Sequence, residues 1–207
     1  SKIDGAKADQ FYSEGKNTNL TGIIVGLKDL VDVKDKITSA GSEILEKNFA
    51  KYNAKITDDF QNQRSVIIGK TNLVEFAFGT LGINSNTSTC RNPWDTNRVP
   101  GGSSSGSAVA VSAGMCNVAI GTDTGGSVRM PASLCGITGF KPSYGVVSRR
   151  GVLDLSWSMD HVGPMAKSAE DCLEVMKSIS GFDINDKYSY KSDDNFQKVP
   201  KNAKFNP

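Results

Sequence analysis

The sequence is poor in the residues that build metal sites and disulfide frameworks. Its 207 residues include one histidine, four irregularly spaced cysteines and no Cys-x-x-Cys pair. A structural zinc site needs several closely spaced Cys or His ligands, and a disulfide scaffold shows regular cysteine spacing. We therefore predict no metal and no disulfide framework. We expect reduced, mostly buried thiols in a cytoplasmic protein at Cys90, Cys116, Cys135 and Cys172.

Charge of one sign and long apolar runs are also scarce. The 24 basic and 22 acidic side chains leave a net charge of +2, so nothing favours nucleic acid or an anionic membrane as a direct partner. The apolar runs are interrupted by Ser and Gly and are too short to span a bilayer. No signal-peptide pattern opens the sequence.

What the sequence does have is an alternation of strand-like and helix-like segments. Hydrophobic content of 38% and charged content of 22% allow a packed core. Short β-rich apolar runs predict strands at 22–27, 65–69, the first part of 117–127, and 137–142. Helices are expected at 52–63, 71–79 (Thr71 cap, Gly79 stop), 108–113, 127–136, and from a Ser168–Asp171 capping box through Ile179, closed by Gly181. This alternation predicts an α/β fold, a sheet flanked by helices.

The stretch GGSSSGSAVAVSAG, residues 101–114, is the first candidate for a site. Gly/Ser tracts are usually flexible linkers. Here Pro100 precedes the tract and small apolar residues follow at once, which a linker does not need. A Walker-type phosphate loop would need a lysine that is absent. Backbone N–H groups at a Gly/Ser-rich helix start can still hold an anion, including a developing oxyanion.

The stretch IGTDTGGSVRMP, residues 120–131, is the second candidate. Its DTG triplet occurs once, so an aspartic-protease site would require a homodimer, and the helix-like segment that follows fits poorly. The alternative interpretation places Ser127 at the end of a Gly-Gly turn after a strand. Successive N–H groups of such a turn can point at one oxygen, which suits a serine nucleophile.

A serine nucleophile needs a base, and the sequence offers several. His161 is the only histidine, and a lone histidine is more often structural. A lysine can serve if burial lowers its pKa enough to keep it neutral. Lys28 ends an apolar strand, where burial is plausible, although solvent exposure is the commoner fate of lysine. Spacing alone does not choose among Lys28, Lys70 and Lys141.

Several separate blocks together resemble the amidase signature family, in that family's order and spacing. The resemblance extends from about Thr21 to Gly181. The blocks are TGIIVGLKDLVDV, IIGKTNLVEFAFG, RNPWDTNRVPGGSSSGSAVAVSAG and AIGTDTGGSVRMPASLCGITGFKPSYGVVSRRGV.

The resemblance implies a Ser–cisSer–Lys triad. It implies that Ser127 is the nucleophile, that Ser103 follows a cis peptide bond and bridges, and that Lys28 is the base. The implied oxyanion hole is formed by the backbone at Thr124, Gly125, Gly126 and Ser127. Implied supporting residues are Ser104, Asp123 and Arg129. Ala77 and Phe78 lie in a block that approaches the acyl pocket in this family, with ordinary helix packing as the alternative.

The resemblance implies an amidase that hydrolyses non-peptide C–N bonds of a small-molecule amide through an acyl-enzyme, without metal or organic cofactor. One alternative is the A subunit of glutamyl-tRNA(Gln) amidotransferase, working with a B-type partner subunit. A second alternative is an inactive fragment or binding module. The free amidase is favoured by Arg150, Trp157 and His161. A homodimer is the assembly expected for it.

We expect residues 1–207 to be a single domain, the N-terminal portion of a mixed β-sheet fold that family members complete with a longer chain. The polar segment 182–207 would then lead to the missing half. An unfinished sheet exposes an apolar face and an unpaired edge, so we expect this chain alone to be inactive or poorly stable.

Overall fold

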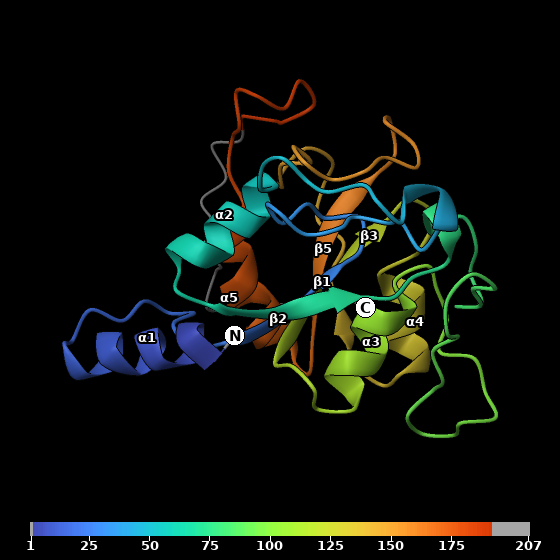
Figure 1. Cartoon of the computed structure of the whole chain (residues 1–207), viewed down its shortest axis with the longest axis horizontal. Coiled ribbons are helices and arrows are strands. Elements are labelled where there is room, and N and C mark those ends of the chain that lie inside the picture. The colour runs from blue at the N-terminus through green and yellow to red at the C-terminus, as the bar shows by residue number, and fades with distance from the viewer. Residues whose placement is uncertain (1, 192–207) are drawn as a thin grey trace, which may run out of the picture.

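A five-stranded mixed sheet forms the centre of the molecule (Figure 1). The structure is a computed structural model, and it describes residues 2–191. The strands are β1 (Ile24–Lys28), β2 (Val66–Thr71), β3 (Val118–Asp123), β4 (Thr138–Gly139) and β5 (His161–Ala166). They lie in the order β2-β1-β3-β5-β4. The β1 strand is parallel to β2 and β3, whereas β5 is antiparallel to β3 and β4.

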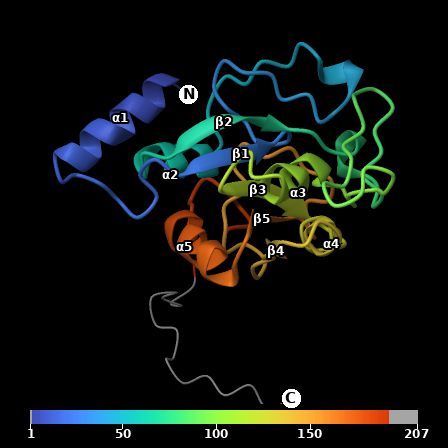
Figure 2. The same cartoon turned by 90° about the horizontal axis from the view of Figure 1, so that it is seen from below.

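Helices cover both faces of this sheet (Figures 1 and 2). The helices are α1 (Lys2–Ser13), α2 (Lys55–Asn62), α3 (Ser105–Ser112), α4 (Arg129–Leu134) and α5 (Ala169–Ile179), with short 3-10 turns η1 (Glu43–Leu45) and η2 (Glu75–Ala77). Figure 2 shows α1 beside the β2 edge of the sheet. No helix among residues 2–191 combines the length and apolarity needed to cross a membrane.

Strand β3 is buried over its whole length, and its side chains alternate between hydrophobic clusters on the two faces of the sheet. Val118 and Ile120 face the core formed with α2 and α5. Ala119 faces the other side, where it packs against Val111 of α3. Successive residues of a strand point to opposite faces, so a strand covered on both sides is apolar at consecutive positions. The small residues of α3 allow this helix to approach the sheet closely.

Most of the predicted elements are confirmed, and one is wrong. The expected helix at 71–79 is absent: β2 extends to Thr71, and only the single turn η2 follows. Phe76 and Ala77 have positive φ angles of 47° and 60°, which a helix excludes. The expected strand at 137–142 shortens to β4. The prediction also missed α1 and β5.

The beginning of the predicted surface segment 182–207 contributes to packing. Asp183 and Asp186 are buried, and their carboxylates accept hydrogen bonds from Ser148 Oγ at 2.7 Å and from the Arg149 N–H at 2.8 Å. Residues 192–207 lie outside the described part of the chain. The expectation of mostly buried thiols is confirmed, because three of the four cysteines are buried and Cys90 is partly exposed.

Candidate active site

Lys28 is the centre of the candidate site. It is the last residue of β1, which lies between β2 and β3, and it is 0% exposed. Its Nζ donates hydrogen bonds to Ser103 Oγ and Thr122 Oγ1, both at 2.8 Å. Sequence reasoning did not single out Thr122. The signal was available in the strand prediction, because Thr122 lies near the carboxyl end of β3, the neighbour parallel to β1.

The surroundings of Lys28 favour its neutral form. Burial lowers the pKa of Lys28 from 10.5 to about 7, although the negative charges of Asp160 and Asp123 act in the opposite direction. A buried ammonium loses hydration, whereas a nearby carboxylate stabilises it. Lys28 can therefore accept a proton near neutral pH, as a general base requires.

The other candidate bases have different partners. Lys70 Nζ forms an ion pair with Asp29 at 2.5 Å, and Lys141 Nζ donates to the carbonyl of Pro142 at 2.7 Å. His161 Nδ1 lies 3.1 Å from the carbonyl oxygen of Asp123. In the described part of the chain, none of the three hydrogen-bonds to Ser103 or Ser127. Of the candidate bases, Lys28 is the one that hydrogen-bonds to Ser103 within residues 2–191.

Ser103 lies where the Gly/Ser-rich stretch turns into α3. The peptide bond between Gly102 and Ser103 is cis, and Ser103 is 0% exposed. Its carbonyl accepts a hydrogen bond from the N–H of Val74 at 3.1 Å. The stretch 101–114 is therefore a packed, hydrogen-bonded segment in this fold, unlike a linker.

Ser104 attaches the same segment to β3. Its hydroxyl donates to the carbonyl of Thr122 at 3.2 Å and accepts from the Thr122 N–H at 3.3 Å. A Cβ at Gly121 would lie 2.7 Å from Ser104 Oγ, so this close approach requires glycine in the strand. The expected supporting position of Ser104 thus has a visible physical basis: it keeps Ser103 beside Thr122 and Lys28.

The loop after β3 is organised around the fully buried carboxylate of Asp123. It accepts hydrogen bonds from the N–H groups of Gly126, Val128 and Arg129 at 2.8, 3.1 and 3.3 Å, and from the Arg129 guanidinium at 3.0 Å to each oxygen. Burial alone would raise the pKa of Asp123, but these donors outweigh burial and lower the pKa to about 2. The Asp123 carboxylate and its partner Arg129 therefore brace this loop.

The backbone of this loop carries donors that can bind an anionic oxygen. The N–H of Gly126 is occupied by Asp123. The N–H groups of Thr124, Gly125 and Ser127 donate to no acceptor within residues 2–191. Three of the four expected donors are thus available, and Gly126 is committed to holding the loop.

Ser127 lies beside the Ser103 segment and reaches the surface, with 8% of the residue exposed. Its carbonyl accepts a hydrogen bond from the Ser104 N–H at 3.3 Å. Within residues 2–191 no hydrogen bond joins the hydroxyls of Ser103 and Ser127, so the structure forms the first link of the expected relay and leaves the second open. Such contacts are often long without substrate and shorten when it binds.

The tentative pocket residues differ from each other. Ala77 is buried in a cluster with Leu30, Ala40 and Leu73, although no α-helix forms at this position. Phe78 is 82% exposed.

A side chain on Gly102 would collide with Val74 at 2.9 Å and with the carbonyl of Gly79 at 3.2 Å. The 74–79 block therefore lies directly against the segment that carries Ser103.

The residues that favoured a free amidase make structural contacts. Arg150 forms ion pairs with Asp183 at 3.1 Å and Asp58 at 3.5 Å. Trp157 stacks on Tyr188 with ring centroids 5.7 Å apart. These contacts join neighbouring segments of the fold, and they give no information about the substrate.

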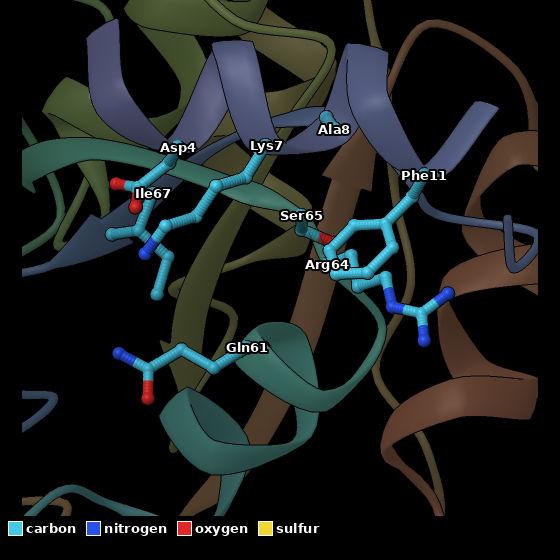
Figure 3. A pocket seen from close by; sticks show the side chains of 8 residues that line it. All are labelled: Asp4, Lys7, Ala8, Phe11, Gln61, Arg64, Ser65 and Ile67. Atoms are coloured by element: carbon cyan, nitrogen blue, oxygen red, sulfur yellow. The ribbon is translucent and has the colours of Figure 1, made fainter. Parts of the chain in front are cut away.

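A cavity of about 220 Å³ lies away from this site, between α1 and the corner joining α2 to β2 (Figure 3). Lys7 and Phe11 of α1 line one side, and Gln61 and Arg64 line the other. The Arg64 guanidinium lies 3.8 Å from the centre of the Phe11 ring. Ser65 also lines the cavity, and its hydroxyl donates to the carbonyl of Leu20 at 3.1 Å. Among residues 2–191, no group of three His, Cys, Asp or Glu side chains is arranged to hold a metal.

Comparison with known proteins identifies relatives of this chain. The family model described as Amidase matches residues 2–206. The A subunit of glutamyl-tRNA(Gln) amidotransferase from Marinomonas sp. (strain MWYL1) is 49% identical over 184 residues, which cover 89% of this chain and 38% of that protein. The same protein from Coxiella burnetii (strain Dugway 5J108-111) is 47% identical over 182 residues, which cover 88% of this chain and 38% of that protein.

Solved structures similar to this chain include an amidotransferase subunit and an amidase. The A subunit of glutamyl-tRNA(Gln) amidotransferase from Thermotoga maritima superposes with a TM-score of 0.82 at 45% identity, over 86% of this chain and 39% of that one. The peptide amidase from Stenotrophomonas maltophilia superposes with a TM-score of 0.84 at 36% identity, over 97% of this chain and 41% of that one. The chain thus spans about 38% of the length of the curated relatives it matches. With the mixed sheet and the family model in agreement, this chain belongs to the amidase family.

Proposed function

We propose that the protein containing this chain hydrolyses amide C–N bonds through an acyl-enzyme on Ser127. The observation that carries the proposal is the hydrogen bond from the fully buried Lys28 Nζ to Ser103 Oγ, next to a loop whose N–H groups at Thr124, Gly125 and Ser127 have no acceptor within residues 2–191. A neutral amine beside a hydroxyl is a proton acceptor in position, and the loop provides the complementary site for negative charge.

The steps follow from these positions. Ser127 Oγ forms a bond to the amide carbon while its proton passes to Ser103 Oγ and the Ser103 proton passes to Lys28 Nζ. The oxyanion is held by free N–H groups of the 124–127 loop; in hydrolases the loss of one such donor costs roughly 2.7–4 kcal/mol. The proton then returns through Ser103 to the leaving nitrogen, the C–N bond breaks, and ammonia or an amine departs. Water then attacks the ester carbon and gives a proton through Ser103 to Lys28 Nζ. As the ester C–O bond breaks, this proton returns through Ser103 to Ser127 Oγ and the carboxylic acid departs.

A second candidate narrows the substrate to glutamine. It is favoured by the 45–49% identity to proteins named as the A subunit of glutamyl-tRNA(Gln) amidotransferase. In that case the released ammonia is used by a partner, the B-type subunit expected from the resemblance, instead of being lost to solvent. The free amidase would act alone or as a homodimer. The cytoplasmic location expected from the reduced thiols stays a prediction.

The proposal is tested by ammonia release from propionamide and from glutamine, measured on the full polypeptide that carries this sequence. We expect Ser127→Ala to abolish release without lowering the melting temperature. Ser143→Ala, at an exposed serine, should keep the wild-type rate. Hydrolysis of either amide that survives Ser127→Ala would overturn the proposal.

The two candidates are separated in the same assay. Release from glutamine that rises when a B-type subunit is added, with little release from propionamide, identifies the amidotransferase component. Comparable release from propionamide without any partner identifies a free amidase.

A further inference from the structure

Asp160 is a buried carboxylate outside the expected site, at the start of β5. Asp160 is 6% exposed. One carboxylate oxygen accepts a hydrogen bond from Thr124 Oγ1 at 2.5 Å. The other accepts from the N–H groups of Leu155 and Ser156 at 2.7 and 2.9 Å. Asp160 therefore joins the 155–160 turn to the first residue of the oxyanion loop.

The sheet register explains why these two residues meet. In the antiparallel pair of β3 and β5, Asp123 lies opposite His161. One step further along both strands places Thr124 opposite Asp160, where side chains on one face approach closely. The contact is thus built by the strands themselves, and the 155–160 turn fills the remaining acceptor positions of the carboxylate.

The negative charge of Asp160 also reaches Lys28. Asp160 and Asp123 both raise the pKa of Lys28 and so oppose the effect of burial. Charged groups from several elements surround Asp160. They are Lys28 at the end of β1, Asp123 at the end of β3 with its partner Arg129 at the start of α4, and Asp154 with its partner Arg149 in the preceding loop. His161 is the next residue, in β5.

We infer that Asp160 is a positioning residue for the proposed hydrolysis, fixing Thr124 in the oxyanion loop and placing a negative charge near Lys28. The inference rests on the proposed function. It assigns two separable effects to one carboxylate: the hydrogen bond holds the loop geometry, and the charge partly offsets the effect of burial on Lys28.

The test uses the full polypeptide and the rate at which a fluorophosphonate labels Ser127, because this reaction needs no knowledge of the substrate. The rate is measured between pH 5 and 10 for the wild type, Asp160→Asn and the matched control Asp154→Asn. For Asp160→Asn we expect the plateau rate to fall about 10- to 100-fold, as for a misplaced reacting group. We also expect the midpoint of the acid limb to move to lower pH, because a charge that raises the pKa of Lys28 is gone. Asp154→Asn should leave both unchanged.

A second pair of variants, at Thr124, separates the effect of the hydrogen bond from the effect of the charge. These variants also test the inference if Asp160→Asn does not fold. Thr124→Val removes the hydrogen bond but keeps the charge, so the plateau should fall while the midpoint stays at its wild-type pH. Thr124→Ser keeps a hydroxyl and should recover most of the lost rate. The inference is overturned if Asp160→Asn keeps the wild-type midpoint, or if Thr124→Val labels as fast as Thr124→Ser. Failure of the proposed function looks different, because the wild type would then carry no label on Ser127.

Discussion

At the residue scale, the molecule depends on one lysine that burial keeps close to neutrality. Lys28 is surrounded by hydroxyls, and the two carboxylates that influence its pKa do not contact its Nζ. The neutral amine places no charge in this buried position, and it gains a charge only when it accepts a proton. The sequence indicated that Lys28 ends an apolar strand. It could not show that Thr122 and Ser103 would satisfy the amine, because strand β3 and the 101–104 segment meet it only in the folded sheet.

The low pKa of Lys28 predicts how stability depends on pH. In the unfolded chain the amine keeps its ordinary pKa near 10.5, and in the folded chain the pKa is about 7. Between these values the unfolded state binds one proton more, so the contribution of Lys28 to stability rises with pH and is least favourable below pH 7. Lys28→Met removes this dependence. We expect its free energy of unfolding, relative to wild type, to improve as pH falls from 10 to 7.

Denaturant unfolding of both proteins across this pH range checks the prediction. Lys47→Met, at an exposed lysine, provides the baseline. A difference between Lys28→Met and wild type that does not change from pH 10 to pH 7 would mean that the folded lysine titrates like a free one.

At the scale of elements, the carboxylate of Asp123 accepts most of the hydrogen bonds that hold the loop between β3 and α4. Asp123 has no exposed surface and accepts from three backbone N–H groups and from Arg129. Asp123→Asn leaves the Arg129 guanidinium and several backbone donors with a weaker partner. We expect a loss of about 1–3 kcal/mol in the free energy of unfolding, because the carboxylate and its backbone donors lose hydrogen bonds while the Arg129 side chain is 53% exposed.

The pH dependence of this loop has the opposite sign to that of Lys28. The folded pKa of Asp123 is about 2, below its unfolded value of 3.8, so its stabilising contribution is complete above about pH 4 and is lost as pH falls toward 2. Denaturant melts at pH 7 and pH 2.5 check this. The penalty of Asp123→Asn should shrink at the lower pH, and an equal penalty at both would exclude the paired carboxylate as its source.

The start of α5 offers a test of local capping. Ser168 accepts a hydrogen bond from the Asp171 N–H at 3.1 Å and donates to the Asp171 carboxylate, as the sequence predicted. Ser168→Ala should cost about 1 kcal/mol in the free energy of unfolding. Ser178→Ala, inside the same helix, should be neutral or slightly stabilising, because alanine favours helix interiors. Thermal melts of the two variants that coincide would show that the cap contributes nothing.

The strands that the sequence predicted differ in composition from strand β5, which it did not predict. Strands β1 and β3 are buried on both faces and read as continuous apolar runs. Strand β5 contains Gly163 and Pro164, which argue against a central strand in isolation. It forms because Pro164 lies opposite Ile120 and its carbonyl accepts the N–H of Phe140, so tertiary pairing outweighs local preference. Asp160 was missed with it, since its role depends on the register of this strand.

At the scale of the whole molecule, the described sheet is open at its edges. Strand β2 carries the outward-facing Ile68, which is 53% exposed, and Phe78 and Trp94 are also largely exposed. Unpaired edges with apolar side chains favour association between molecules. We expect the 207-residue chain alone to associate in size-exclusion chromatography and to release no ammonia from amides. Amide turnover by the isolated chain would contradict this expectation.

The central claim is that Lys28 activates Ser127 through Ser103. The most direct measurement is mass spectrometric mapping of a fluorophosphonate adduct on the full polypeptide, in wild type, Ser127→Ala and Lys28→Ala. The account predicts an adduct on Ser127 in wild type, none in Ser127→Ala, and labelling slowed about 10²- to 10⁴-fold in Lys28→Ala, the range for loss of a general base. An adduct on another serine, or wild-type labelling of Ser127 in Lys28→Ala, would contradict it.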